Sequence, residues 1–409
     1  MNPLPIVWAD CRRAKTGILS VVCLIAIAVA LGVAVSAQER ALRTGSARAA
    51  DAFDLLIGAP GSQTQLVLTA VYLQPAALPL LPGEVLTRLQ TEARAAYAAP
   101  IAFGDSYLGY PVVGSTADFL TQGGRIAPRE GRIFQTIHEV VVGSDVRLQM
   151  GGRFTPVHGQ TRAEVHDDDE DEAEHRHEGV KYTVVGRLPR SSTPWDRAIV
   201  APVEAVWKIH GLGTGHKEGG SRIGPPWTDP ELPGVPAIVV KPKSVADAYT
   251  LRATFRVGGT MAVFPAEVLV EIYALLGDAR DLLATFSVAT QALVIAAVLL
   301  AVFATLALRR RQFAVLRALG ASRGYIFLVV WTHVSLLIAA GTALGLLLGW
   351  AGAYVVSWFL SKHSGIALPV ALGAPEIGMA LALIGIGCIL AAIPSWSSYR
   401  QPVSANLRS

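Results

Sequence analysis

Long apolar runs alternate with a long polar stretch along the chain. Residues 17–37 form an uncharged apolar run that is long enough to cross a bilayer as a helix. Similar runs occupy residues 282–308, 326–360 and 375–394, whereas residues 38–281 have the mixed composition of an aqueous domain. The pattern therefore predicts an α-helical membrane protein with four transmembrane helices and a large domain inserted between the first and the second.

The chain before the first span predicts a short interfacial helix over residues 1–16. Trp8 suits the headgroup level, and basic residues follow it. Residues 35–37 (Val-Ser-Ala) would also suit a signal-peptide cleavage site. The apolar core of a signal peptide usually has about 7–15 residues. The run here is longer, which favours a retained helix within residues 1–37.

The inserted region carries both helical and strand signals. Short Val- and Thr-rich runs bounded by Gly and Pro indicate strands, and two stretches indicate helices. We expect helical structure over residues 46–56 and 84–98 and strands over residues 65–72, 110–114, 139–142, 181–185, 198–200 and 237–240. Mixed signals of this kind predict an α+β domain outside the cytoplasm.

Composition agrees with a protein that is part membrane and part aqueous domain. The 409 residues are 52% hydrophobic and 16% charged, too apolar for an ordinary soluble protein. The net charge of +4 does not indicate nucleic acid, because much of the positive excess lies beside the apolar runs and no basic, aromatic-interleaved face is present. The three cysteines lie in or next to the predicted spans, so they predict no disulfide in the inserted domain.

Residues 309–325, between two apolar runs, carry five arginines and no acid. Short loops rich in Lys and Arg remain in the cytoplasm, which also places both termini there. Helical spacing indicates a short amphipathic helix that ends at a glycine. Its candidate functional residues are Arg309, Arg310, Arg311, Phe313, Leu316, Arg317, Leu319 and Gly320.

The string RRRQFAVLRALGAS within this segment resembles the coupling segment of FtsX-like permeases, the MacB-type and lipoprotein-releasing branch of ABC transporters. The cytoplasmic tail, residues 395–409, is similar to the family's tail, although Ser404 stands where an acid is common. The order of one span, a large external domain and three spans is also the family's layout. The external loop of that layout corresponds here to residues 361–374.

This resemblance implies a permease subunit in a bacterial inner membrane that transmits mechanical motion. The chain lacks the GxxxxGK[ST] loop that binds ATP phosphates, so ATP hydrolysis would belong to a partner ABC ATPase and the chain would not be an enzyme. The family implies a homodimer surrounded by lipid, with a periplasmic accessory or substrate protein as a further partner. The substrate stays open between a lipoprotein, a small molecule or peptide, and a metal-linked cargo.

Two other functions stay open. A non-transporting permease would use ATP to regulate a periplasmic hydrolase or sensor, and a passive metal-binding membrane protein would have no ATPase. No HExxH or Cys-x-x-Cys motif indicates an enzyme.

Gly341, Gly345 and Gly349 recur every four residues within one predicted span. Small residues in one register let two helices approach closely, so we expect a packing face there, in the same subunit or between subunits. His333 lies in the same span, where a packed histidine is a commoner explanation than a proton relay.

The segment 158–179 combines an acidic run with three histidines, His166, His175 and His177. Imidazole and carboxylate groups suit Zn²⁺, although the spacing matches no closed zinc motif. A solvated acidic loop would have the same composition. His-rich external loops in permeases that this chain resembles suggest a link to zinc homeostasis.

Overall fold

The computed structural model describes residues 2–13, 15–74, 76–158, 180–216, 222–308, 315–317 and 320–399. The chain forms two compact units, which we call the helical unit and the α+β unit. The helical unit comprises Met1–Arg43, Leu275–Phe359 and Leu368–Ser409, and the α+β unit comprises Thr44–Ala274 and Leu360–Ala367.

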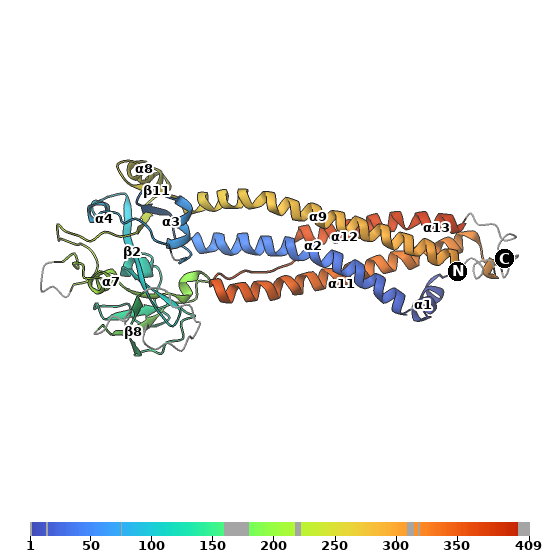
Figure 1. The fold of residues 1–409 in the computed structure, drawn as a ribbon, viewed down its shortest axis with the longest axis horizontal. Helices are drawn as coiled ribbons and strands as arrows, with labels where there is room; N and C mark the ends of the chain where they lie inside the picture. The colour runs from blue at the N-terminus through green and yellow to red at the C-terminus, as the bar shows by residue number, and fades with distance from the viewer. Residues whose placement is uncertain are drawn as a thin grey trace. The chain divides into compact units, whose positions relative to one another are not determined.

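The helical unit contains the apolar runs. Its described helices are α1 (Leu4–Arg13), α2 (Lys15–Ala50), α9 (Pro265–Leu308), α11 (Arg323–Ser364), α12 (Ala374–Leu390) and α13 (Ala392–Tyr399) (Figure 1). Among the described residues, Lys15–Ala50 and Arg323–Lys362 are long and apolar enough to cross a membrane, and α12 is apolar but shorter. The count of four spans stays a prediction.

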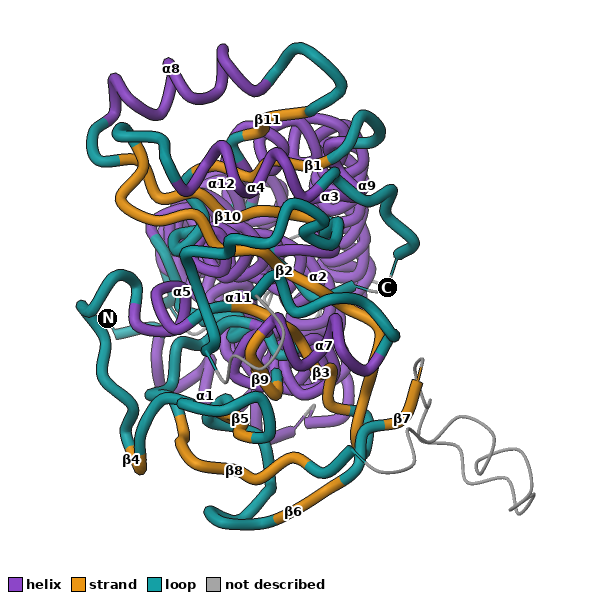
Figure 2. The backbone as a smooth tube through the Cα atoms, turned by 90° about the vertical axis from the view of Figure 1, so that its left-hand side faces the viewer, coloured by secondary structure: helices purple, strands orange, loops and turns teal. Residues whose placement is uncertain are grey.

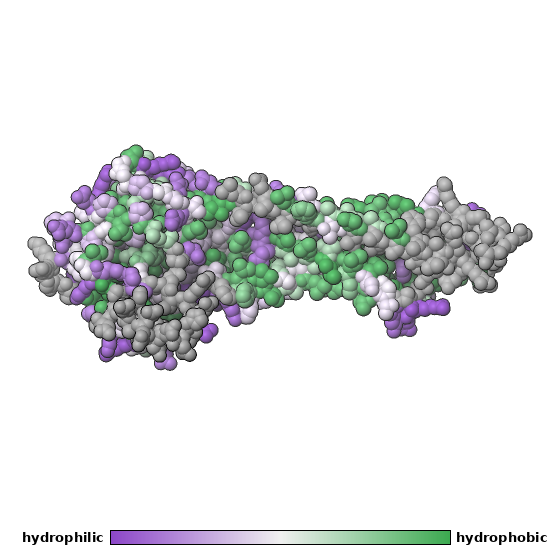
Figure 3. Space-filling model, in the orientation of Figure 1, coloured by the Kyte–Doolittle hydropathy of each residue, from purple (hydrophilic) through white to green (hydrophobic). Residues whose placement is uncertain are grey.

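Hydrophobic residues cover much of the described surface of the helical unit on the face shown in Figure 3. Ile27 of α2, Leu293 of α9 and Leu381 of α12 are all more than 60% exposed. An apolar surface of this extent on a helix bundle is suited to lipid rather than to water.

Three helices extend beyond the predicted spans. Helix α2 continues past Ala37 to Ala50, and α9 starts at Pro265, well before the apolar run that begins at residue 282. Helix α11 covers Arg323–Ser364, a few residues more than the predicted span 326–360 at each end. The predicted limits of residues 38 and 281 followed hydropathy, which changes where apolar side chains end. A helix continues as long as its backbone hydrogen bonds do. The boundaries between the two units therefore lie inside α2, α9 and α11.

A single mixed sheet forms the centre of the α+β unit (Figure 2). Its described strands lie in the order β11-β1-β10-β2-β3-β9-β5-β8-β4, with β6 paired to β8 and β7 paired to β2. Their bounds are β1 (Leu55–Gly58), β2 (Ala95–Tyr107), β3 (Tyr110–Ser115), β4 (Glu130–Gly131), β5 (Glu139–Val142), β6 (Arg153–Phe154), β7 (Val157–His158), β8 (Tyr182–Arg187), β9 (Ile199–Pro202), β10 (Ala237–Pro242) and β11 (Met261–Val263).

Short helices accompany this sheet. They are α3 (Gln63–Ala70), α4 (Gly83–Gln90), α5 (Ala117–Thr121), the 3₁₀ helix η1 (Pro194–Arg197), α7 (Val203–Ile209) and α8 (Val245–Phe255).

Both faces of the sheet are buried, because alternate residues of one strand belong to different hydrophobic cores. In β5, Val140 and Val142 pack in one core and Val141 in the other. In β10, Ile238 and Val239 divide in the same way. Strands with two buried faces are continuous apolar runs, which explains why the sequence located them.

The strands predicted at residues 110–114, 139–142, 181–185, 198–200 and 237–240 are confirmed as β3, β5, β8, β9 and β10. The strand predicted at 65–72 is wrong, since this segment contains the helix α3. The Ser62 hydroxyl caps it by accepting a hydrogen bond from the Gln65 backbone N–H at 3.2 Å, and Leu66, Val67 and Ala70 are buried at helical spacing.

The helix predicted over residues 84–98 is correct only in its first half. It ends as α4 at Gln90, and β2 begins at Ala95. The alanines of β2 favour a helix on their own, but here β2 pairs with β10 and β3, and tertiary pairing overrides local propensity.

The segment predicted as a short external loop, residues 361–374, is divided between the two units. Residues 360–367 join the α+β unit, where the Arg197 guanidinium donates to the Lys362 carbonyl at 2.9 Å and Ile366 packs in a hydrophobic core. A Gly365 φ of +73° permits the turn there.

Candidate functional site

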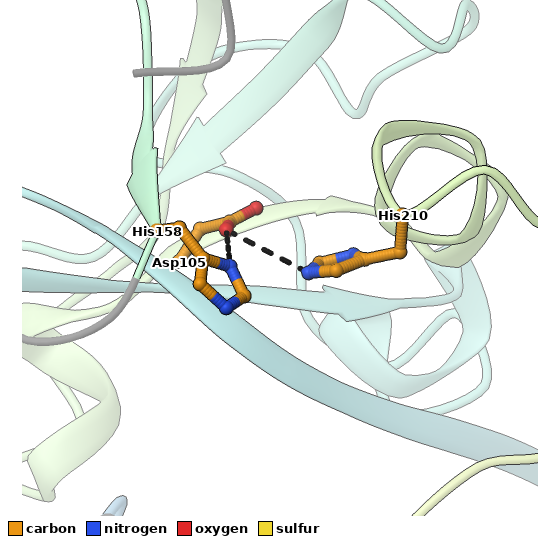
Figure 4. Close-up of side chains that lie close together, drawn as sticks. All are labelled: Asp105, His158 and His210. Carbon is orange, nitrogen blue, oxygen red and sulfur yellow. Dashed lines mark hydrogen bonds and ion pairs between the residues drawn. The ribbon is translucent and has the colours of Figure 1, made fainter. Parts of the chain in front are cut away.

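The histidines predicted to bind metal, His166, His175 and His177, lie outside the described residues. The strand immediately before them, β7, is described, and its last residue is His158. His158 lies beside two other residues that sequence reasoning did not single out, Asp105 and His210 (Figure 4). We call these three residues the Asp-His-His cluster.

The register of the sheet places Asp105 of β2 directly opposite His158 of β7. A β-bulge immediately precedes the aspartate. Ala102 pairs with Gly114 and Asp105 with Val112, so β2 uses one residue more than β3 over this distance. A bulge changes the direction of the side chains that follow it, and bulges are frequent next to functional sites.

His210 reaches the cluster from the C-terminal end of α7. The helix lies close to β3 at Gly114, where a Cβ would lie 2.8 Å from the Val206 Cγ2 atom. Gly104 makes room for the imidazole in the same way, because a Cβ there would lie 3.0 Å from the His210 Nε2 atom. Two glycines thus permit the close approach of α7 and its histidine to the sheet.

The Asp105 carboxylate lies between the two imidazoles. Its Oδ1 atom is 3.4 Å from His158 Nδ1 and 3.9 Å from His210 Nε2, and the two rings are 5.3 Å apart between centroids. The side chain of Asp105 is 1% exposed, whereas that of His158 is 53% exposed. The cluster therefore joins a buried carboxylate to solvent through a half-exposed histidine.

The surroundings of the carboxylate are largely apolar. Tyr182 is fully buried in a core of the α+β unit, and burial together with the nearby Asp105 charge raises the pKa of its hydroxyl. Gly104 and Asp105 also line a cavity of about 510 Å³, whose other lining residues include Leu73, Leu78 and Phe103. A charged group in such surroundings requires a cationic partner.

Chemically, the Asp-His-His cluster offers two imidazole nitrogens and one carboxylate oxygen. These three atoms all lie within 4.8 Å of one another, which is close enough to hold a metal ion together. Among the described residues, this cluster is the group of three that meets this condition. The sequence contained one signal for it, an aspartate inside an apolar strand. That signal did not identify the histidine partners, because they are 53 and 105 positions away.

The predicted coupling residues are described only in part. Arg309, Arg310, Arg311, Phe313 and Leu319 lie outside the described residues, whereas Leu316, Arg317 and Gly320 are inside them. The Ala321 N–H donates to the Leu316 carbonyl at 3.0 Å, the Gly320 N–H donates to the Arg317 carbonyl at 3.1 Å, and Gly320 has a φ of +100°. This is the Schellman arrangement that ends a helix at a glycine.

The three regularly spaced glycines of α11 face α2 of the same chain. A Cβ at Gly341 would lie 2.7 Å from the Ile25 Cβ, and one at Gly349 would lie 2.7 Å from the Val33 Cβ. Gly345 lies between these two glycines, about one helical turn from each, and makes the same kind of contact with α2. The glycine register therefore marks a contact between α2 and α11, which we call the glycine face.

A second contact near the C-terminal end of α2 is polar. The buried carboxylate of Glu376, in the first turn of α12, accepts hydrogen bonds from the Ser36 hydroxyl at 2.6 Å and the Arg40 guanidinium at 2.9 Å. Its other oxygen accepts from the Gly373 N–H at 2.8 Å. The Ser357 hydroxyl of α11 donates to the Gln38 side chain at 3.0 Å. Together these residues form a polar layer that joins α2, α11 and α12.

Comparisons with known proteins place the C-terminal part of the chain in a family. No curated protein matches the chain. One solved structure matches part of the chain: the extracellular domain of the noncanonical ABC-type transporter YknZ from Gram-positive bacteria. The match has 11% sequence identity and a TM-score of 0.29, and it covers 51% of this chain and 98% of the YknZ chain. Residues 284–403 match the FtsX-like permease C-terminal family. Over these residues, the chain is similar to the C-terminal region of FtsX-like permeases.

Proposed function

We propose that the chain is the membrane subunit of an ABC transporter and that it couples ATP hydrolysis by a separate ATPase to movement of the α+β unit. The observation that carries the proposal is the family match over residues 284–403, because this range holds both the coupling segment and the helices beside it. The subunit would sit in a bacterial inner membrane as a homodimer, with both termini in the cytoplasm and no enzymatic activity of its own.

In this proposal the coupling segment 309–325 contacts the ATPase. Arg309, Arg310 and Arg311 face lipid headgroups or acidic residues of the ATPase, and Arg317 adds to this charge. Phe313, Leu316 and Leu319 fill a groove on the ATPase. The helix end at Gly320 supports this role, because it separates the segment from the start of α11 at Arg323.

Motion of the coupling segment would pass to the rest of the subunit through packed helices. The glycine face holds α11 against α2, and the polar layer holds α12 against both. Close-packed elements move as bodies rather than deforming continuously. Both α2 and α11 continue as unbroken helices into the α+β unit, which supports a mechanical role.

The α+β unit would act on a substrate in the periplasm or the outer leaflet. A lipoprotein, a small molecule or peptide, and a metal-linked cargo all stay candidates, with a periplasmic protein as accessory or substrate.

The test is affinity purification of the full-length protein from its native membrane, followed by mass spectrometry. We expect an ABC ATPase to co-purify with the wild type and to be lost from Leu316→Glu, since a carboxylate would enter an apolar groove. Val315→Glu is the matched control, because Val315 is 47% exposed and is not one of the three apolar residues proposed to fill the groove.

Two results would contradict the proposal. Absence of any ATPase from the wild-type sample would contradict the proposal that the chain is a transporter subunit. Equal loss of the ATPase in both variants would show that charge anywhere in the segment disturbs the complex, and the groove contact would then be wrong. A periplasmic hydrolase recovered in a nucleotide-dependent complex, with no cargo moved, would favour the regulatory alternative.

A further inference from the structure

We propose that Asp105, His158 and His210 form a Zn²⁺ site in the α+β unit. The site is distinct from the predicted positions His166, His175 and His177, and it does not depend on the proposed coupling to an ATPase. It rests on donor chemistry, on the spacing of the donor atoms, and on the hydrogen bond that fixes the orientation of one histidine.

The donor set suits zinc better than a hard cation. Imidazole nitrogen is a preferred ligand of Zn²⁺, and carboxylate oxygen commonly completes its shell, whereas Ca²⁺ and Mg²⁺ take oxygen ligands. With zinc–ligand bonds of about 2.0–2.1 Å, tetrahedral ligand atoms lie about 3.3 Å apart. The Asp105 oxygen is already 3.4 Å from the His158 nitrogen and 3.9 Å from the His210 nitrogen. Small side-chain rotations would close the site around an ion.

The tautomer of His210 points to a cation between it and Asp105. Its Nδ1 atom lies 2.8 Å from the Val206 carbonyl oxygen, which can only accept, so Nδ1 must carry the proton. In the neutral ring, the Nε2 lone pair then faces the Asp105 carboxylate. Two electron-rich atoms at this distance repel each other unless a proton or a metal ion lies between them. A backbone carbonyl that holds the other nitrogen is also the usual support of a histidine ligand.

The backbone around the cluster is arranged in advance. The bulge in β2 directs Asp105, the pairing of β2 with β7 places His158 opposite it, and Gly104 leaves room for His210. Because the carboxylate is buried and His158 is half exposed, an ion can arrive from solvent without unfolding of the sheet. Three protein ligands leave a fourth position open, as in zinc sites that bind water or a further ligand, so the site would bind exchangeable rather than purely structural zinc.

The experiment uses the full-length protein in lipid nanodiscs in a background that carries His166→Ala, His175→Ala and His177→Ala. This background removes the competing histidines of the acidic segment. Zn²⁺ is titrated against a chromophoric chelator, and Co²⁺ is added separately to record its visible ligand-field absorption. We expect one Zn²⁺ per chain and the intense Co²⁺ bands of a four-coordinate site with nitrogen ligands.

Two substitutions locate the site. Asp105→Asn and His158→Ala should each weaken Zn²⁺ binding at least about tenfold and diminish the Co²⁺ bands. His138→Ala is the matched control, because it removes another exposed histidine of the same unit and should change neither measurement. Thermal unfolding without metal tests the fold of each variant. If Asp105→Asn fails to fold because Asp105 is buried, His158→Ala still tests whether the site binds zinc, because His158 is half exposed.

Two results would overturn the site. In the first, His158→Ala binds Zn²⁺ as tightly as the background protein and the His138→Ala control; His158 would then be only an ion-pair partner of Asp105. Alternatively, the background protein binds no Zn²⁺, and metal affinity resides in the acidic segment. Neither result bears on ATPase co-purification, so failure of this proposal is distinguishable from failure of the proposed function.

Discussion

Gly345 of α11 and Val29 of α2 lie so close together that a Cβ on the glycine would be 2.6 Å from the Val29 Cβ and 2.7 Å from the Ala26 carbonyl oxygen. The second of these is a backbone atom, which cannot rotate away. The distance between the helices is therefore fixed by the absence of a side chain at Gly345. If motion passes along α11, this contact determines whether α2 follows.

Gly345→Ala should consequently lower the thermal stability of the full-length protein in nanodiscs, with an overpacking cost of about 1–3 kcal/mol. Gly352→Ala, a change in the same helix, is the matched control, since a Cβ there meets nothing within 4 Å. We expect the control to be neutral or slightly stabilising, because alanine favours a helix. Equal melting temperatures for the two variants would show that α2 and α11 can separate without cost.

The sequence predicted this packing face but not its partner. Strict spacing identifies a stripe on α11 without showing whether α2 or another subunit covers it. In the same way, continuous apolar runs located β5 and β10, whereas the Asp-His-His cluster depends on a bulge, a strand register and a helix end. Those features arise from tertiary pairing, so local pattern cannot reveal them. The wrong prediction of a strand at α3 has a related cause. The Val and Leu residues of this segment suit a strand, but the Ser62 cap stabilises a helix.

Gly320→Ala should weaken coupling without removing the α11 helix. The residue has a φ of +100°, a conformation that alanine adopts only with strain of about 1 kcal/mol, so the helix end would shift or fray. If the proposed coupling to an ATPase is correct, we expect reduced ATPase activity of the purified complex. Gly324→Ala, within the first turn of α11, has open space around it and should leave activity unchanged. Full activity of both variants would exclude a role for this helix end.

The ion pair between Arg40 and Glu376 should contribute more to stability than an exposed pair on the same helix. Removing the buried carboxylate with Glu376→Ala leaves the partly buried donors of Ser36 and Gly373 without this acceptor, at a cost of about 1–3 kcal/mol. A double-mutant cycle with Arg40→Ala isolates the coupling energy. The control cycle uses the more exposed pair Glu39 and Arg43, for which we expect about 0.5 kcal/mol or less. Similar coupling in both cycles would contradict a special role for the polar layer.

Glu139 should make the α+β unit more stable at neutral pH than in acid. Two hydrogen bonds from the Arg132 guanidinium, at 2.6 and 2.7 Å, lower the pKa of Glu139 in the folded protein. A lowered folded-state pKa stabilises above the ordinary value of about 4.3, and this stabilisation is lost as the pH falls through the folded-state pKa. Glu139→Gln should therefore lower the melting temperature by a few degrees at pH 7, and the difference should shrink on acidification. A difference independent of pH would assign the effect to packing instead.

Gly104→Ala tests the geometry of the proposed zinc site without changing a ligand. The new methyl group would lie 3.0 Å from His210 Nε2 and 3.1 Å from Cε1, closer than ordinary van der Waals contact. His210 cannot simply turn, because its Nδ1 atom is held by the Val206 carbonyl, so the ring must move as a whole away from Asp105. We expect Zn²⁺ affinity to fall about tenfold in the chelator titration. Because Gly104 has a φ of +156°, the matched control is Gly109→Ala, a change at another positive-φ glycine (φ +75°) whose Cβ would meet nothing within 4 Å. Because all three ligands remain in Gly104→Ala, unchanged affinity would mean that the position of His210 does not control zinc binding, whereas a selective loss would tie binding to the space that this one glycine leaves.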